Sequence, residues 1–113
     1  MKFLWTTLHV TQLESSLAFY RDRLGLSVNR RIEPAKIVFL GSGETLLELI
    51  EGEAKPSDGI SLGFSVNNLE YWTESLRDCL VSDIISPMPG FRFCFVTDPD
   101  GYRVQLVETG THD

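Results

Sequence analysis

The sequence predicts an α+β fold in which two tandem βαβββ modules form a cupped mixed sheet. Three features predict it: strands with alternating apolar residues, two short amphipathic helices, and an internal repeat relating one half of the chain to the other. The chain has 113 residues, the length of a single domain. We therefore expect one domain over 1–113, made of an N-terminal module, 1–55, and a C-terminal module, 59–109.

The repeat becomes visible when the sequence is shifted by 56 residues against itself. Residues 10–24 and 66–80 then share six identities in fifteen positions, where ordinary composition gives about one. With one more residue inserted, 46–52 also overlays 103–109. The match predicts two modules of the same architecture.

The N-terminal module begins with a loosely alternating strand at 3–10. Thr11 and Glu14 then form a predicted capping box, in which each side chain binds the backbone amide of the other residue. Apolar residues at helical spacing run from 13 to 24, and Gly25 is placed to end this helix in a left-handed conformation. Three strands follow, at 27–33, 36–40 and 45–51, with turns at 34–35 and 41–43.

The C-terminal module repeats this order after a turn-rich linker at 56–59. A strand at 60–66 leads to a second helix cap at Asn67-Asn68 and to a helix that runs from 69 to 80. The remaining strands are expected at 83–86, 91–97 and 102–108. The last one follows the turn DPDG, 98–101, which has proline at its second position.

Composition and charge exclude several classes of protein. A formal net charge of −6 argues against nucleic-acid binding, which needs a concentrated positive surface. No apolar run is long enough to span a bilayer or to form a secretory signal, so we expect a cytoplasmic protein without membrane contact. Cys79 and Cys94 are too few for a disulfide scaffold and too far apart for a zinc motif. We expect both to be reduced and buried.

Strand alternation predicts which residues lie opposite the helices. Leu4 and Leu8 of the first strand and Ile60 and Leu62 of the strand at 60–66 are expected to face a helix. Four strands then direct one residue each toward a common concave surface: Trp5, Glu48, Ser61 and Gln105. In the repeat, Trp5 matches Ser61 and Glu48 matches Gln105.

Three stretches carry a resemblance to a known family: LHVTQLESSLAFYRDRLGL (8–26), LLELIE (46–51) and FVTDPDGYRVQLVE (95–108). Together they resemble the vicinal oxygen chelate superfamily, or VOC domain, which contains glyoxalase I, extradiol dioxygenases, and the fosfomycin and bleomycin resistance proteins. The resemblance covers essentially the whole chain. It implies the glyoxalase/bleomycin resistance fold, commonly assembled as a homodimer whose pockets lie between the subunits.

The resemblance also locates the metal-ligand positions of the superfamily, which in glyoxalase I carry His or Gln and Glu. In this sequence they are Trp5, Glu48, Ser61 and Gln105. Glu48 is an ordinary metal ligand, Gln105 offers a weak carbonyl oxygen, and Trp5 has only an N–H donor. Zinc, nickel and iron sites of this kind need three or four stronger donors. We therefore expect no metal and no cofactor.

The same substitutions affect the expected chemistry. Isomerisation of the glyoxalase type needs a base that removes a proton next to a carbonyl and a cation that stabilises the enediolate. Gln105 is not a base near neutral pH. Glu48 and His9 are the candidate catalytic residues, although a histidine at the rim with no special role is the more ordinary interpretation of His9.

The residues at these positions favour ligand binding. Trp5 has a flat face suited to stacking, Glu48 can meet a cationic group, and Phe91 and Phe93 either line the surface or belong to the core. The predicted ligand-binding residues are Trp5, Thr7, His9, Glu48, Ser61, Ser65, Phe93 and Gln105.

Three functions follow as hypotheses. The leading one is a metal-independent protein similar to the bleomycin-resistance branch, which holds a small molecule in a cleft at the dimer interface and sequesters an antibiotic or a metabolite. The alternative is a lyase or isomerase of glyoxalase type, metal-free or divergent, with Glu48 or His9 as base. The third is a structural dimer in which Trp5 fills the cleft.

Overall fold

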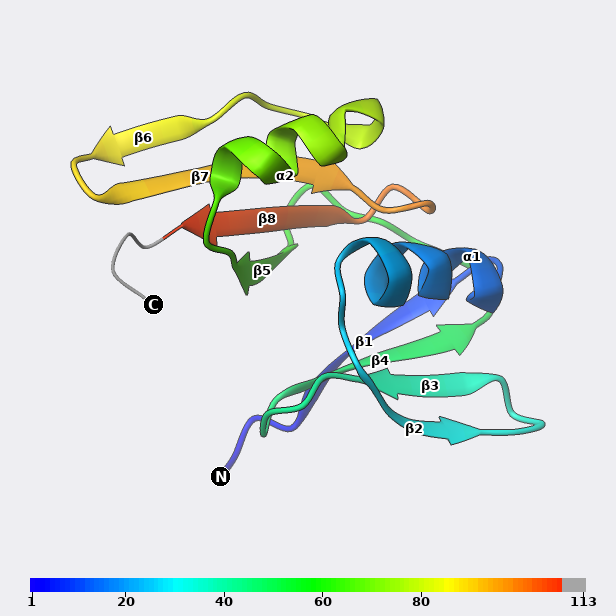
Figure 1. Ribbon diagram of the computed structural model, residues 1–113. Helices are drawn as coiled ribbons and strands as arrows, with labels where there is room; N and C mark the ends of the chain where they lie inside the picture. The colour runs from blue at the N-terminus through cyan, green and yellow to red at the C-terminus, as the bar shows by residue number, and fades with distance from the viewer. Residues whose placement is uncertain (109–113) are drawn as a thin grey trace. The chain divides into compact units, whose positions relative to one another are not determined.

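The structure, a computed structural model, describes residues 1–108 (Figure 1). The predicted end of the second module, at residue 109, lies outside the described residues. The chain divides between Lys55 and Pro56 into two compact units, which we call the first and the second module. Each contains one four-stranded mixed sheet and short helices, so the α+β class and the two similar modules predicted from the repeat are confirmed.

The first module is a sheet with a helix over one face (Figure 1). Its elements are β1 (Trp5–Val10), α1 (Leu13–Leu17), a π-helical segment (Ala18–Arg23), β2 (Val28–Ile32), β3 (Ile37–Leu40) and β4 (Leu46–Glu51). The strand order is β1-β4-β3-β2, with β1 parallel to β4 and the other pairs antiparallel. Gly25, with φ of 85°, follows the helix in the left-handed conformation that was predicted.

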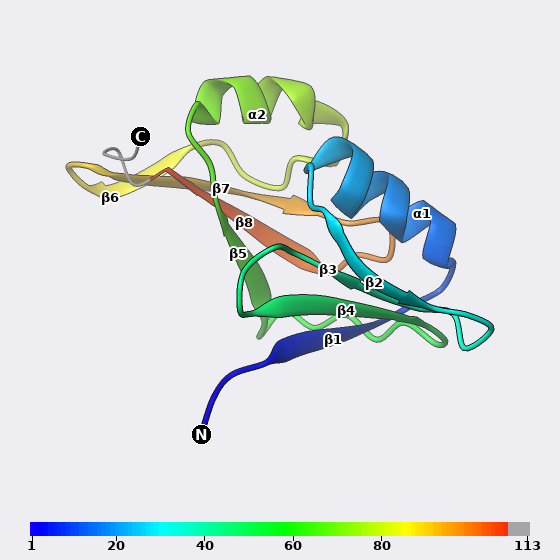
Figure 2. The same cartoon turned by 60° about the horizontal axis from the view of Figure 1, so that its bottom comes forward.

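The second module repeats this topology, with α2 over one face of its sheet (Figure 2). Its elements are β5 (Ser61–Ser65), α2 (Leu69–Ser75), a 3₁₀ turn (Arg77–Cys79), β6 (Ile85–Met88), β7 (Phe91–Thr97) and β8 (Arg103–Glu108). The strand order is β5-β8-β7-β6, and β5 is parallel to β8. No helix in the described part of the chain combines the length and the apolar character needed to cross a membrane.

Alternation along the strands separates a buried face from an open one in each module. The buried apolar side chains of the first module are Leu8, Val10, Leu13, Leu17, Phe19, Tyr20, Val38, Leu40, Leu47 and Leu49. Those of the second module are Leu69, Leu76, Cys94, Val96, Val104 and Leu106. Burying one such leucine contributes about 2 kcal/mol, so the helix-facing residues supply most of the stability.

Two residues expected to face a helix do not. Leu4 is 50% exposed and Ile60 is 65% exposed. Each precedes the first residue of its strand, Trp5 or Ser61, so the pleat of the sheet does not hold its side chain against the helix.

The predicted capping box at the start of α1 is wrong. The helix begins with Gln12 at the N-cap position, and the Gln12 side chain makes no capping hydrogen bond. The amide of Leu13 instead donates to the Glu51 carboxylate at the end of β4, at 2.9 Å. Lys36 forms an ion pair with the same carboxylate at 3.0 Å. A distant strand therefore provides the acceptor that a neighbouring side chain was expected to provide.

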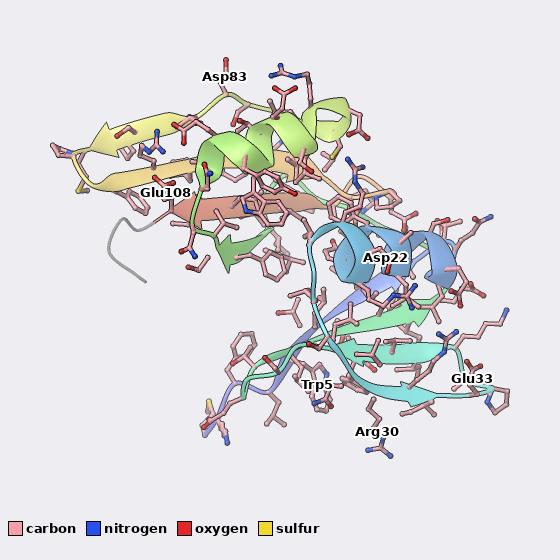
Figure 3. All side chains as sticks on the ribbon, in the orientation of Figure 1. Trp5, Asp22, Arg30, Glu33, Asp83 and Glu108 are labelled. Atoms are coloured by element: carbon pink, nitrogen blue, oxygen red, sulfur yellow. The ribbon has the colours of Figure 1, made fainter. Side chains whose placement is uncertain are left out.

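The second module has the same arrangement at equivalent positions. Glu108, at the end of β8 (Figure 3), accepts a hydrogen bond from the Leu69 amide at 2.9 Å. Arg92 donates to the Glu108 carboxylate at 2.7 Å, in the place that Lys36 has in the first module. Asn68 also caps α2, as predicted, by accepting from the amide three residues later at 3.2 Å.

These contacts lower the pKa of both carboxyl groups. The Leu69 amide is the largest cause for Glu108, followed by Arg92. The Leu13 amide is the largest cause for Glu51, followed by Lys36. A lowered folded-state pKa means that each carboxylate stabilises the fold when ionised and loses this effect as the pH falls through that pKa.

Two further predictions need correction. The strand expected at 83–86 is β6, which begins two residues later. It is an edge strand with an irregular register against β7, so its pairing sets its limits more than its own alternation does.

Cys79 is half-buried rather than buried, and its thiol donates to the Leu76 carbonyl at 3.5 Å. Cys94 is buried as expected, and burial raises its pKa.

The DPDG turn before β8 is held by its first residue. The Asp98 carboxylate accepts hydrogen bonds from the amides of Asp100 at 2.9 Å and Tyr102 at 2.8 Å. Gly101 has φ of 94°, and a Cβ there would lie 3.6 Å from Pro56. The turn therefore requires glycine for its backbone conformation and delivers β8 in a defined register.

Replacing Glu108 with glutamine should lower the free energy of unfolding by about 1 kcal/mol at pH 7, because α2 loses its charged acceptor and Arg92 loses an ionic partner. The difference in unfolding free energy between variant and wild type should reach its full size at pH values well above 4.5, the ordinary pKa of a glutamate. It should shrink as the pH falls through the lower pKa that Glu108 has in the folded protein. Urea unfolding at pH 7 and pH 3 measures both effects. Glu53→Gln, which removes the same charge from an exposed position, is the control, and an equal loss in the two variants would contradict the capping role.

Candidate functional site

The candidate site lies on the sheet surfaces that point away from the helices. The first face belongs to the first module and consists of Trp5, Thr7 and His9 of β1, Leu46, Glu48 and Ile50 of β4, and Ile37 and Phe39 of β3. The second face belongs to the second module and consists of Ser61, Gly63 and Ser65 of β5, Arg103, Gln105 and Val107 of β8, and Phe93, Phe95 and Thr97 of β7.

Strand pairing brings the predicted ligand-binding residues together in two groups. The first face holds Trp5, Thr7, His9 and Glu48, and the second face holds Ser61, Ser65, Phe93 and Gln105. The central row of the first face is Thr7, Glu48 and Phe39. The central row of the second face is Gly63, Gln105 and Phe95. Glu48 and Gln105 thus have equivalent places in their sheets.

Trp5 and Phe39 form an aromatic corner on the first face. Their ring centroids are 5.1 Å apart and the ring planes are inclined at 70°, an edge-to-face contact. Because β4 lies between β1 and β3, the rings meet over the strand that carries Glu48. Trp5 remains 42% exposed and lies on the side of the sheet away from α1 (Figure 3). Its flat surface is accessible to a planar ligand.

Glu48 is half-buried and has a defined orientation on the first face. The Thr7 hydroxyl donates to its Oε1 atom at 2.5 Å. Within residues 1–108 no other hydrogen-bond partner of this carboxylate is found, so Oε2 can accept a hydrogen bond from a ligand. His9 is exposed on the same strand as Thr7, two residues further along, where it pairs in register with Ile50.

The second face is mainly neutral and aromatic. The Gln105 amide oxygen lies beside Gly63, 3.9 Å from the point that a Cβ on that glycine would occupy. Phe93 contacts Phe91 and Phe95, with ring centroids 5.3 and 5.7 Å apart. The half-buried ring of Phe93 therefore belongs to an aromatic run along β7.

Among the residues of these faces that were not predicted as ligand contacts, the two phenylalanines and the arginine offer the most chemistry: Phe39, Phe95 and Arg103. Phe39 and Phe95 are 56 residues apart, the period of the repeat, so the repeat itself could have identified them as a matched pair. Arg103 precedes the buried Val104, and strand alternation therefore predicts that Arg103 lies on the open face. Alternation does not predict its contact with the Phe95 ring, whose centroid is 5.7 Å from the guanidinium carbon.

The residues at the superfamily's metal positions do not fit a metal ion. On the first face the indole of Trp5 has no lone pair to donate, and the Glu48 carboxylate already accepts from Thr7. On the second face Ser61 and Gln105 offer a neutral hydroxyl and a neutral amide. Within the described residues, no group of three or more His, Cys, Asp or Glu side chains is arranged to hold a metal. The donor set present is one for hydrogen bonding and stacking.

Comparison with known proteins places this fold in a family. Residues 2–106 match the model of the Glyoxalase/Bleomycin resistance protein/Dioxygenase superfamily. A lactoylglutathione lyase of Escherichia coli O157:H7 is 32% identical, over 96% of this chain and 93% of that protein. A crystal structure of a lactoylglutathione lyase from Agrobacterium tumefaciens covers 96% of this chain and 94% of its own, with a TM-score of 0.71 and 22% identity. A protein of unknown function from the same species has a TM-score of 0.79 and 21% identity, with 96% and 94% covered. The chain therefore belongs to the Glyoxalase/Bleomycin resistance protein/Dioxygenase superfamily.

Proposed function

We propose that this protein binds a small molecule without a metal ion. The observation that carries the proposal is the aromatic corner of Trp5 and Phe39. The resemblance expects a metal ligand at the position of this indole, and Phe39 pairs in register with Glu48. Stacking on an exposed aromatic ring suits a planar or aromatic group. A carboxylate beside such rings suits a cationic or hydrogen-bond-donating substituent.

The proposal includes the assembly and the biological role expected from the resemblance. The protein would act as a homodimer and would sequester an antibiotic or a metabolite. The net charge of −6 is compatible with a cationic ligand, because it favours approach of positive charge over negative charge. The surface around Glu48 then provides the specific contact.

A second candidate is a lyase or isomerase of glyoxalase type. Curated relatives at 30–32% identity carry the name lactoylglutathione lyase, and this favours the candidate. Glu48, held by Thr7, would act as the base and would remove a proton next to a carbonyl group. His9 is the other candidate base on the first face.

Metal removal separates the two candidates. Protein treated with a chelator should unfold at the same temperature as untreated protein, and calorimetric titration with Ni²⁺ or Zn²⁺ should show no tight site, because Trp5 cannot ligate. Neither ion should produce lactoylglutathione-forming activity. The triple variant Trp5→His, Ser61→His, Gln105→Glu, which introduces ligands of the glyoxalase I type, is the positive control for metal binding. A stoichiometric ion that survives dialysis would contradict the proposal, and metal-free activity would favour the second candidate.

Aromatic stacking and charge can be tested with benzamidine, a planar aromatic cation. Trp5→Ala should weaken its binding about tenfold, or about 1.4 kcal/mol, and Glu48→Gln should weaken it by a smaller factor. Ligand-detected NMR titration measures both. Trp72→Phe removes the other tryptophan, which lies on α2 and on neither face, and should leave the affinity unchanged. Equal affinity in the wild type and Trp5→Ala would contradict the proposed site, and no binding at all would favour a dimer whose cleft is filled by Trp5.

A further inference from the structure

Arg103 is the charged residue of the second face. It is the first residue of β8, and its register partners are Ser61 on β5 and Thr97 on β7. Gln105 follows two residues later on the same face. The other members of this face are neutral, so a guanidinium stands among hydroxyl, amide and aromatic groups with no carboxylate of the second face beside it.

The Arg103 guanidinium lies over an aromatic ring. Its central carbon lies 5.7 Å from the centroid of the Phe95 ring. A cation–π contact of this kind attracts the guanidinium to the ring and uses none of its five N–H donors. The side chain is 36% exposed, so these donors can be reached by a ligand. An accessible guanidinium fork matches the two oxygens of a carboxylate or a phosphate.

The carboxylate contact of Arg103 is weaker than the contacts of Arg92, a well-paired arginine in the same sheet. Arg92 is hydrogen-bonded to both Glu70 and Glu108 at 2.7 to 3.0 Å, so its donors are occupied within the protein. For Arg103 the carboxylate neighbour within residues 1–108 is Asp58, at 4.0 Å, which is beyond hydrogen-bonding distance. The Asp58 side chain is fully exposed, and such a contact is weak and easily displaced.

The repeat shows that this charge is specific to the second module. Arg103 pairs with Ser61 as Leu46 pairs with Trp5, so the equivalent place in the first module is apolar. The first module has its charge one row further along, at Glu48, and that charge is negative. The two faces share a backbone pattern but present groups of opposite sign.

We infer that Arg103 is an anion-binding residue of the second face, and that it takes a carboxylate or phosphate group of a small-molecule ligand. The inference deepens the proposed function and rests on it. Two parallel N–H···O bonds from the guanidinium would bind the anion, and the Ser61 hydroxyl and Gln105 amide in the adjoining positions offer neutral donors. The overall charge of −6 opposes the approach of anions, so an anion that binds here depends on the local contact with the guanidinium.

The inference can be tested on the intact protein with inorganic phosphate and acetate as probes. The NMR signal of the Arg103 Nε–H group should shift and saturate with one of the two anions, and the anion with the higher affinity identifies the group as phosphate or carboxylate. Arg103→Gln should weaken that binding at least about tenfold. Arg30→Gln, which removes an exposed arginine of β2 (Figure 3), should leave it unchanged. Absence of a saturable shift, or equal responses of Arg103 and Arg30, would overturn the inference.

Benzamidine binding to the wild-type protein tests the proposed function separately from the anion site at Arg103. Protein that binds benzamidine through Trp5 but shows no Arg103 response to either anion retains the proposed function and refutes the anion site. Loss of the proposed function is shown by the Trp5→Ala comparison, which does not involve Arg103.

Discussion

The arrangement of each module depends on a carboxylate at the end of its central parallel strand. Glu51 and Glu108 both bind the first amide of the helix that precedes them in the chain. Because strand side chains alternate between the two faces, a glutamate that reaches the helix determines on which face each remaining residue of its strand lies. Glu48, three residues before Glu51, must lie on the opposite face, and so must Gln105 relative to Glu108. The cap and the candidate site are therefore two consequences of one strand orientation.

Comparison of the two modules shows which matched positions keep the same type of residue and which carry different residues. The carboxylates at 51 and 108, the cations at 36 and 92, and the phenylalanines at 39 and 95 match in type. These residues hold the helix against the sheet or support the centre of the open face. On the open faces the matched positions differ in chemistry: Trp5 matches Ser61 and Leu46 matches Arg103. The modules thus have the same architecture and present different chemistry.

The chemistry of the first face follows from one large side chain, the indole of Trp5. An indole cannot ligate a metal, and its contact with Phe39 covers part of the sheet with aromatic surface. Glu48 then lies beside rings and a threonine hydroxyl rather than among other metal ligands. Such a surface suits the binding function proposed above, whereas metal-assisted isomerisation requires an electrophile.

Sequence periodicity alone determined the order of strands and helices, the twofold repeat and the faces on which Trp5, Glu48, Ser61 and Gln105 lie. These properties depend on local spacing, which a single sequence displays directly. Only the tertiary structure decided how α1 is capped and which rings Trp5 and Arg103 contact. The capping bonds of Leu13 and Leu69 and the Thr7–Glu48 bond join residues 38 to 41 positions apart. Only strand pairing and the packing of each helix on its sheet bring such residues into contact. The tertiary structure also decided where β6 begins and ends, because an edge strand takes its register from its neighbour.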